Sequence, residues 1–410
     1  MRAGASGVAD RRVALTVRYR LTPWWVKVIV VFALSRVVTT AILLTFAAKQ
    51  PANAWTGASP SYTDFASMWD GHWYYIIAVV GYPTTLPITD TGHVGESAWA
   101  FMPAYPAVVR LLMTVTGLDF PVLAVVVSVA CALGAALLFY KLMHLVLPGG
   151  TALFAVVLFC VAPLSPILQV SYAESMHLLL LTFALYLLLQ RRYWVLLPVI
   201  AVMSLTRPSG LAFALTLGLH VVHRFVTRAR DEFPARERVA ATVATVFSGI
   251  AGLAWLLIAW ALTGSFTAYT DTELAWRSAY IGYEELVPFT PWLKAAGFWS
   301  SYWGMPLPLL VGILVIGVAG FFAALFTPWA RRLGIDLRLW IASYALYLLA
   351  VFFPQSSTFR LLVPLFPALG AVAQPRSPWY RVSLVLVFIA GQVLWVNGAW
   401  WVDGYDWTPP

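Results

Sequence analysis

The sequence predicts an all-α membrane protein that crosses the bilayer many times. This prediction rests on hydropathy, on the scarcity of charge and on the length of the apolar runs. Of the 410 residues, 61% are hydrophobic and 10% are charged, and the mean hydropathy is +0.80. A soluble domain carries roughly 25% charged residues, whereas about 20 apolar residues are enough for one helix to cross a bilayer. We therefore expect a bundle of about 11 transmembrane helices.

The apolar runs that predict these helices are long enough, or nearly long enough, to span. They fall at about 24–48, 120–146, 150–164, 172–189, 193–206, 208–227, 239–264, 305–327, 337–353, 359–374 and 381–401. Pro163, Pro166 and Pro208 predict broken or tilted helices, whose freed backbone groups are satisfied inside a bundle. A further run at 101–117 carries Arg110 and is expected to form an interfacial helix or a re-entrant segment.

The basic residues orient the predicted bundle. With the N-terminus inside, the segments on the cytoplasmic side carry 19 of the 26 Lys and Arg residues, which is the bias that membrane topology favours. We therefore predict a multi-pass protein of the plasma (inner) membrane. Its parts are a basic cytoplasmic N-terminus (1–23) leading into an uncleaved first span, one transmembrane domain (24–401), an outer tail (402–410), and large outer loops at 49–119 and 265–304.

Several kinds of chemistry lack their sequence signatures. Cys131 and Cys160 lie in apolar runs and form neither a disulfide framework nor a metal-ligand spacing. The chain has no P-loop, no dinucleotide-binding glycine pattern and no nucleic-acid signature. It also lacks the Asp-x-Asp pair that holds a divalent cation in many enzymes that use nucleotide-sugar donors. We expect no obligatory metal, no cofactor and no nucleic-acid partner.

The remaining polar residues collect on the side predicted to face outward. Ionisable groups in or near a bilayer are costly and usually functional. Six separate segments supply such groups, which predicts a membrane-embedded site that opens outward. They contribute Asp64, Asp70 and His72; Glu174 and His177; Arg207; Asp271, Glu273, Glu284 and Glu285; Gln355 and Arg360; and Arg36, about 18 Å up the first span.

One stretch of the first outer loop, "TDFASMWDGHWYYIIAVVGYP" (63–83), combines carboxylates with aromatic residues. It is expected to form one or two amphipathic helices. Asp64 and Asp70 are six residues apart and do not share a helix face, so we do not expect a hydrolase-type acid pair. One of them could accept a proton from a hydroxyl group. The alternative is a structural interfacial helix whose Asp residues cap turns.

Five blocks of sequence together resemble the bacterial members of the GPI mannosyltransferase 2 (PIG-V) family. They are "MWDGHWYYIIAVVGYP" (68–83), "AFMPAYP" (100–106), "PLSPILQVSYAESMHLLLL" (163–181), "SLTRPSG" (204–210) and, more weakly, "FRLLVPLFPAL" (359–369). Their order and spacing carry the resemblance, because each block alone is weak. The sequence departs from the family pattern at Ala173, where Ser is common, and at Phe359, where Tyr is usual.

The resemblance implies a GT-C glycosyltransferase fold and a lipid-linked substrate. Such enzymes take a sugar from a polyprenyl-phosphate donor on the outer face of the membrane, with a catalytic Asp in the first outer loop. The implied donor is polyprenyl-phosphate-mannose, and the implied acceptor is a hydroxyl of a cell-envelope glycolipid or glycan, with inversion at the anomeric carbon. The same fold could move another sugar such as arabinose. A lipid or polysaccharide transporter is the alternative from a different class.

Each candidate residue has a structural alternative. Asp70 is the candidate general base, or forms an Asp-Gly turn; Asp64 is a second acidic group that orients hydroxyls, or a helix N-cap supplied by Thr63 or Asp64. Arg207 and Arg360 would hold the donor phosphate, or extend to the interface. Arg36 would hold the same phosphate or pair with Glu174, and Glu174 would bind sugar or fix Arg207. His72 and His177 would assist the reaction, or would have a structural role only. The aromatic side chains would stack on a sugar or on the prenyl chain, or would only pack inside the protein; they are Tyr172, Trp69 and Trp73.

Overall fold

The computed structural model describes residues 21–285, 287–402 and 410. Within them the fold is all-helical, with a single β-bridge between Ile88 and Val94, as the sequence predicts. The predicted terminal segments, 1–23 and 402–410, lie mostly outside the described residues, which leave out 1–20 and 403–409.

Five helices are long and apolar enough to cross a membrane, judged by length and composition among the described residues. They are α2 (Trp24–Ala47), α6 (Phe120–His144), α11 (Ala235–Thr263), α14 (Leu307–Ala324) and α19 (Pro378–Trp395), the last extended by the π-helical turn η4 (Val396–Trp400). Shorter helices lie between them in the bundle. These are α7 (Gly149–Val161), α8 (Glu174–Leu189), α9 (Tyr193–Ser204), α10 (Gly210–Val226) and α16 (Ile335–Val351).

The predicted span at 359–374 differs from a continuous helix. The chain there forms α17 (Thr358–Leu361), the 3₁₀ segment η3 (Val363–Ala368) and α18 (Leu369–Val372). Pro364 and Pro367 lack the backbone N–H that a continuing α-helix needs. The result is an irregular segment that packs against α16 and α7.

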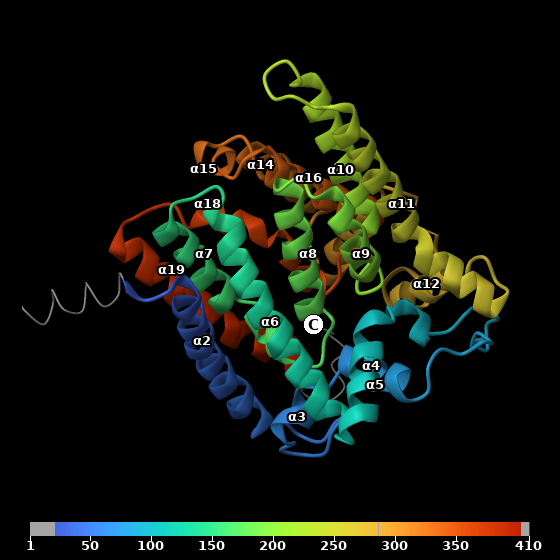
Figure 1. Ribbon diagram of the computed structural model, residues 1–410. Helices are drawn as coiled ribbons and strands as arrows, with labels where there is room; N and C mark the ends of the chain where they lie inside the picture. The colour runs from blue at the N-terminus through green and yellow to red at the C-terminus, as the bar shows by residue number, and fades with distance from the viewer. Residues whose placement is uncertain (1–20, 286, 403–409) are drawn as a thin grey trace, which may run out of the picture.

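The predicted helices of the first long connection are present. They are α3 (Tyr62–Phe65), α4 (Asp70–Val79), the 3₁₀ turn η1 (Ala98–Ala100) and α5 (Ala104–Thr116). The 13 residues of α5 cover only about 20 Å. Helices α7 and α9, at two of the predicted spans, are no longer than α5, so length does not separate α5 from them. In Figure 1, α3, α4 and α5 lie at the lower end of the bundle, opposite the loop that joins α10 to α11.

The second long connection contains α12 (Ala268–Ile281) and α13 (Pro291–Trp303), followed by α14; the short helix α15 (Pro328–Arg331) precedes α16. Helix α12 packs on η1 and α11, and α13 packs on α14 and α16. Both connections therefore contribute to the same region of the molecule.

A close glycine contact fixes the crossing of α10 and α11. A Cβ atom on Gly210 would lie 2.6 Å from Gly252 Cα, a distance that leaves no room for a side chain. The Oγ of Ser248 also donates to the Gly210 carbonyl at 2.9 Å. These contacts hold the start of α10, and with it the preceding residues 205–209, against the bundle.

Candidate active site

A cavity of about 430 Å³ lies where the two long connections meet the bundle. Its wall is formed by α4, η1, α8, the turn at 205–209, α11, α12, α16 and the irregular segment 352–364. Charged side chains that line it include Asp70, Glu174 and Arg207, together with Glu273, Arg277 and Arg360. A volume of this size accommodates a small organic ligand or sugar.

The backbone around Trp69 sets the position of Asp70. Trp69 has φ 57° and ψ −125°, directly before the first residue of α4, a conformation that a bulky residue adopts only when its surroundings enforce it. Its indole N–H donates to the Trp400 carbonyl at 3.0 Å, and its ring lies 4.3 Å from that of Trp55. The backbone N–H of Asp70 donates to Tyr172 Oη at 3.1 Å. Asp70 is thereby fixed at the positive end of a helix.

Two carboxylates and two guanidinium groups form one ionic cluster in this cavity. Arg360 pairs with Asp70 and lies 3.6 Å from Glu174 Oε1. Arg207 pairs with the same Glu174 oxygen at 3.1 Å. The Arg360 guanidinium also lies over the ring of Tyr172, 5.3 Å from its centroid. The charges of the four groups balance, so each buried ion has a partner of opposite sign.

Several buried polar atoms in this region have no hydrogen-bond partner among the described residues. They are both carboxylate oxygens of Glu174, whose contacts to arginine are ion pairs only, both ring nitrogens of His177, Nε of Arg360, Nε1 of Trp276 and Oε1 of Gln355. All five residues line the cavity. Buried polar groups in folded proteins are nearly always hydrogen-bonded, so this concentration of unpaired donors and acceptors fits a cavity that receives a polar ligand.

Helix α12 contributes Glu273, which is among the outward polar groups named in the sequence analysis, and further residues that the sequence analysis does not name. Tyr269, Glu273, Trp276 and Arg277 line the cavity and lie on one face, at helical spacings of three and four. That spacing is a signal that could have been found in the sequence. Burial raises the pKa of Glu273, while Arg277 opposes the shift.

Asp64 and His72 lie in a different place from Asp70. They line a second, polar hollow of about 350 Å³ together with Trp55, Ser67 and Tyr75. The Oγ of Ser61 donates to Asp64 Oδ2 at 2.7 Å and accepts from the Asp64 backbone N–H at 3.2 Å. The N-cap of α3 is therefore Ser61, and the expectation that Thr63 or Asp64 supplies this cap is wrong.

Arg36 is held away from the cavity. Its guanidinium donates to the carbonyl oxygens of Cys160 (2.7 Å) and Ser165 (2.9 Å) and to Gln169 Oε1 (3.0 Å). Glu174, which was one of its two predicted partners, pairs with Arg207 and Arg360 instead. Arg36 thus joins α2 to the carbonyl groups freed between α7 and the 3₁₀ turn η2 (Ser165–Gln169).

The three aromatic candidates make packing contacts. Trp69 and Tyr172 are buried. Trp73 stacks on Phe101 at 5.7 Å and meets Trp276 edge-to-face at 5.4 Å. Phe101 and Trp276 themselves line the cavity. These contacts match the packing alternative for each candidate, with Trp73 and Tyr172 directly behind residues that face the cavity.

Among residues 21–285 and 287–402, no group of three or more His, Cys, Asp or Glu side chains is arranged to hold a metal ion.

The chain has a likeness to a solved structure. No protein-family model and no curated protein matches the chain. A solved structure with a similar arrangement is the Archaeoglobus fulgidus oligosaccharyltransferase tethered to an acceptor peptide, with a TM-score of 0.41 and 13% sequence identity. The match covers 88% of this chain and 54% of that one. The chain therefore spans about half the length of that protein.

Proposed function

We propose that the protein is a GT-C glycosyltransferase of the plasma membrane. It transfers mannose from polyprenyl-phosphate-mannose to a hydroxyl of a cell-envelope glycolipid or glycan on the outer face. The observation that carries the proposal is that all five blocks resembling the PIG-V family supply residues to one cavity. They contribute Asp70 and Tyr74; Ala100, Phe101 and Met102; Glu174, His177 and Leu178; Thr206 to Ser209; and Arg360, Leu361, Val363 and Pro364.

The two arginines suit a lipid-phosphate leaving group. As the bond between the anomeric carbon and the phosphate oxygen breaks, the phosphate gains one negative charge. Preorganised cations stabilise charge that develops in a transition state, and guanidinium groups match phosphate oxygens in pairs. Arg207 and Arg360 both lie within 3.6 Å of Glu174 Oε1, so one phosphate could contact both.

Asp70 is the proposed general base. In the resting protein its carboxylate is paired with Arg360. The donor phosphate would replace Asp70 as the ion-pair partner of Arg360. The free carboxylate of Asp70 could then accept the proton of the acceptor hydroxyl. The acceptor oxygen then bonds to the anomeric carbon from the face opposite the phosphate, and the configuration inverts. The proton ends on Asp70 and the electron pair on the phosphate.

The distribution of charge supports a cavity that faces outward. Helix α8 begins at Glu174 in the cavity and ends at Leu189, about 24 Å away and next to Arg191 and Arg192. Arg224 and the basic loop between α10 and α11 lie at that same far end, where Arg191 and Arg224 both pair with Asp231. Basic loops favour the cytoplasmic side.

A transfer assay with the purified full-length protein tests the proposal. The donor is polyprenyl-phosphate-mannose, and the acceptors are lipids and glycans extracted from native membranes. The wild type is compared with Asp70→Asn, Asp64→Asn and the matched control Asp90→Asn, whose side chain is exposed on the first long connection. We expect Asp70→Asn to lose about 10²- to 10⁴-fold in rate, the usual contribution of a general base, and Asp90→Asn to retain the wild-type rate.

The other outcomes each change a different part of the proposal. Loss of transfer in Asp64→Asn with full activity in Asp70→Asn would make Asp64 the base. Transfer from polyprenyl-phosphate-arabinose but not from the mannose donor would overturn the sugar and keep the enzyme class. Movement of lipid across vesicles without any glycosylated product would indicate a transporter.

A further inference from the structure

Helix α12 brings a carboxylate, an indole and a guanidinium group to one side of the cavity. Glu273, Trp276 and Arg277 all line it, at spacings of three and four residues that place them on one helix face. The helix is also tied to the first long connection, because Ser97 Oγ and Thr272 Oγ1 lie 3.1 Å apart in a buried hydrogen bond. The three side chains are therefore presented to the cavity by an element that is held in place.

The indole N–H of Trp276 is a donor without a partner among the described residues. Its ring is held edge-to-face by Trp73 at 5.4 Å and by Phe101 at 5.8 Å. A buried indole N–H normally has a hydrogen-bond acceptor. This donor is thus fixed in direction and free to bind a ligand in the cavity.

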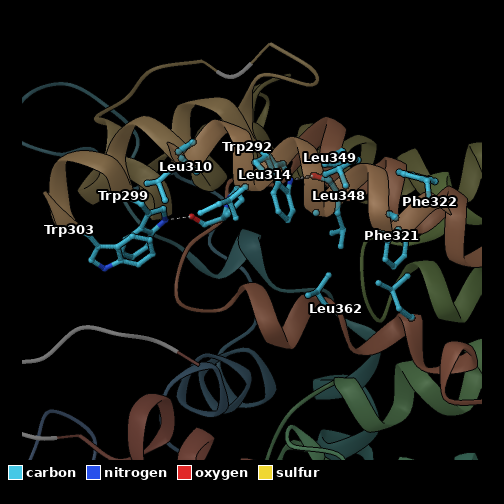
Figure 2. A pocket seen from close by; sticks show the side chains of 18 residues that line it. Trp292, Trp299, Trp303, Leu310, Leu314, Phe321, Phe322, Leu348, Leu349 and Leu362 are labelled. Atoms are coloured by element: carbon cyan, nitrogen blue, oxygen red, sulfur yellow. Dashed lines mark hydrogen bonds between the residues drawn. The ribbon is translucent and has the colours of Figure 1, made fainter. Parts of the chain in front are cut away.

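A neighbouring apolar groove between α13, α14 and α16 provides the contrast (Figure 2). There the indole N–H of Trp292 donates to the Leu348 carbonyl at 3.0 Å. That of Trp299 donates to the Pro354 carbonyl at 2.9 Å, and Figure 2 draws both bonds as dashed lines. Every residue that lines the groove is apolar or glycine. The groove offers no free donor, whereas the α12 side of the cavity does.

Glu273 and Arg277 are charged groups that take no part in the ion pairs of the described residues. The ionic cluster of Asp70, Glu174, Arg207 and Arg360 is complete without them. Arg277 Nε donates to the backbone carbonyl of Glu273 at 2.9 Å, which leaves both Nη atoms without a hydrogen bond in the described part of the chain.

The opposite charges of Glu273 and Arg277 cancel. This side of the cavity therefore carries no excess charge for an anionic ligand, and it combines an acceptor with several donors. Such a set of groups suits a neutral ligand with several hydroxyl groups.

Glu273 is retained at a cost to the folded protein. Burial raises the pKa of its carboxyl group, Arg277 and Arg207 oppose this shift, and Asp70 adds to it. A raised pKa means that the charged carboxylate destabilises the fold at neutral pH. Ionisable groups kept at such a cost near a membrane are usually functional. The influence of Asp70 and Arg207 also shows that Glu273 lies close to the ionic cluster.

The contact between α12 and α4 relates this face to the acceptor. Asp70 begins α4, and Trp73, one turn later, meets Trp276 of α12. In the proposed reaction Asp70 contacts the acceptor hydroxyl, while the donor phosphate lies on the arginines. A sugar whose hydroxyl reaches Asp70 would extend over the polar face of α12.

We propose that Glu273, Trp276 and Arg277 bind the hydroxyl groups of a neutral sugar at the end of the acceptor. This rests on the proposed function for the reaction and adds the residues that select its acceptor. The carboxylate would accept from neighbouring hydroxyl groups, while the guanidinium and the indole would donate to hydroxyl oxygens. A site built to bind hydroxyl groups rejects an analogue that lacks them. The face would therefore select a saccharide over an alcohol with a single hydroxyl.

Direct binding tests the proposal without any transfer reaction. The full-length protein in phosphatidylcholine nanodiscs is titrated with methyl α-mannoside, or with cyclohexanol as a ring with one hydroxyl, and binding is followed by saturation-transfer NMR. We expect Glu273→Gln and Arg277→Gln to weaken binding of the mannoside about tenfold or more, and Trp276→Phe about three- to tenfold. The matched control is Asp271→Asn, because Asp271 lies on the opposite side of α12 and does not line the cavity; it should bind as the wild type does.

Transfer kinetics give a second measurement. The three variants should raise the KM of the acceptor more than they lower kcat, and the KM of the donor should stay near that of the wild type. Since Glu273→Gln removes a buried charge, its weaker binding would not come from a lost fold. A raised KM for the donor instead would assign these residues to the donor sugar and overturn the proposal.

Three binding results would also overturn it: equal binding by the wild type and the three variants, equal binding of cyclohexanol, or displacement of the mannoside by polyprenyl-phosphate-mannose. The last would place the sugar in the position of the donor. The proposed function can fail separately. Binding of the mannoside on α12 without transfer from the mannose donor would remove the proposed function and leave the saccharide site. Transfer that is unaffected by the three variants would do the reverse.

Discussion

Glu174 lies close to both arginines of the ionic cluster, so neutralising its charge tests how much the cluster contributes to stability. Glu174→Gln keeps the shape of the side chain and removes its charge. The lost contacts are to Arg207 at 3.1 Å and to Arg360 at 3.6 Å. With an effective dielectric constant of about 20, each of these pairs corresponds to roughly 5 kcal/mol of Coulomb attraction before desolvation is counted.

The net cost is smaller than this sum for two reasons. The neutral side chain of the variant is not a buried ion, which returns the desolvation energy of the carboxylate, and Arg360 retains Asp70. Arg207 has no other ion pair among the described residues, but its side chain is 17% exposed toward the cavity and can be hydrated there. Breaking a fully buried pair costs about 3–5 kcal/mol. We therefore expect Glu174→Gln to lower the free energy of unfolding by about 2–4 kcal/mol.

The assay is equilibrium denaturation of the purified protein in detergent, followed by tryptophan fluorescence. The matched control is Glu284→Gln, because Glu284 is 58% exposed and pairs with Lys294 at the surface. Exposed pairs contribute little, and we expect a change within about 0.5 kcal/mol. A double-mutant cycle with Arg207→Gln should show a coupling energy of about 1–3 kcal/mol. If Glu174→Gln were no less stable than Glu284→Gln, the reasoning about the ionic cluster would be refuted.

Three further predictions concern residues around and beyond the cavity. Arg36→Leu leaves three acceptors unpaired and should cost about 3 kcal/mol in denaturation, while the folded protein keeps its transfer rate; a lost rate at full stability would place Arg36 on the donor. Burial raises the pKa of Glu273, so the charged carboxylate destabilises the folded protein. Glu273→Gln should therefore be more stable than wild type at pH 7.5. This difference in stability should vanish below about pH 4.3, the pKa of Glu in the unfolded chain, where Glu273 is protonated in both states. Tyr193→Phe removes hydrogen bonds to His220 (2.9 Å) and Glu237 (3.1 Å) and should cost about 1–3 kcal/mol without changing transfer, since Tyr193 begins α9 at the end away from the cavity.

The fold class and much of the ionic cluster could be predicted because charged residues are rare in membrane-spanning sequences, so the few that occur are easily recognised. In a chain with 10% charged residues, Asp70, Glu174, Arg207 and Arg360 stand out, and intramembrane charges generally pair or line a site. The sequence did not determine which partner each would take. Glu174 could fix Arg207 or receive Arg36, and only the packing of α2 against the turn after α7 decides that Arg36 binds carbonyl oxygens.

Other features depend on tertiary structure and have a weak sequence signal. The positive φ angle of Trp69 is stabilised by a hydrogen bond to Trp400, which lies more than 300 residues away in the sequence. The contribution of α12 depends on how the second long connection folds back onto η1. Its helical stripe of Tyr269, Glu273 and Arg277 was visible in the sequence, but an amphipathic helix lying on the membrane would show the same stripe.

The pairing of Asp70 with Arg360 joins residues separated by 290 positions, and this has a consequence for biosynthesis. Chains are made from the N-terminus at roughly 5–20 residues per second, so Asp70 emerges at least about 15 seconds before its counter-ion. During that interval the nascent chain carries an uncompensated acid beside the membrane. The ionic cluster can be completed only near the end of translation, so a protein cut short before α17 would lack Arg360 and leave Asp70 without its counter-ion.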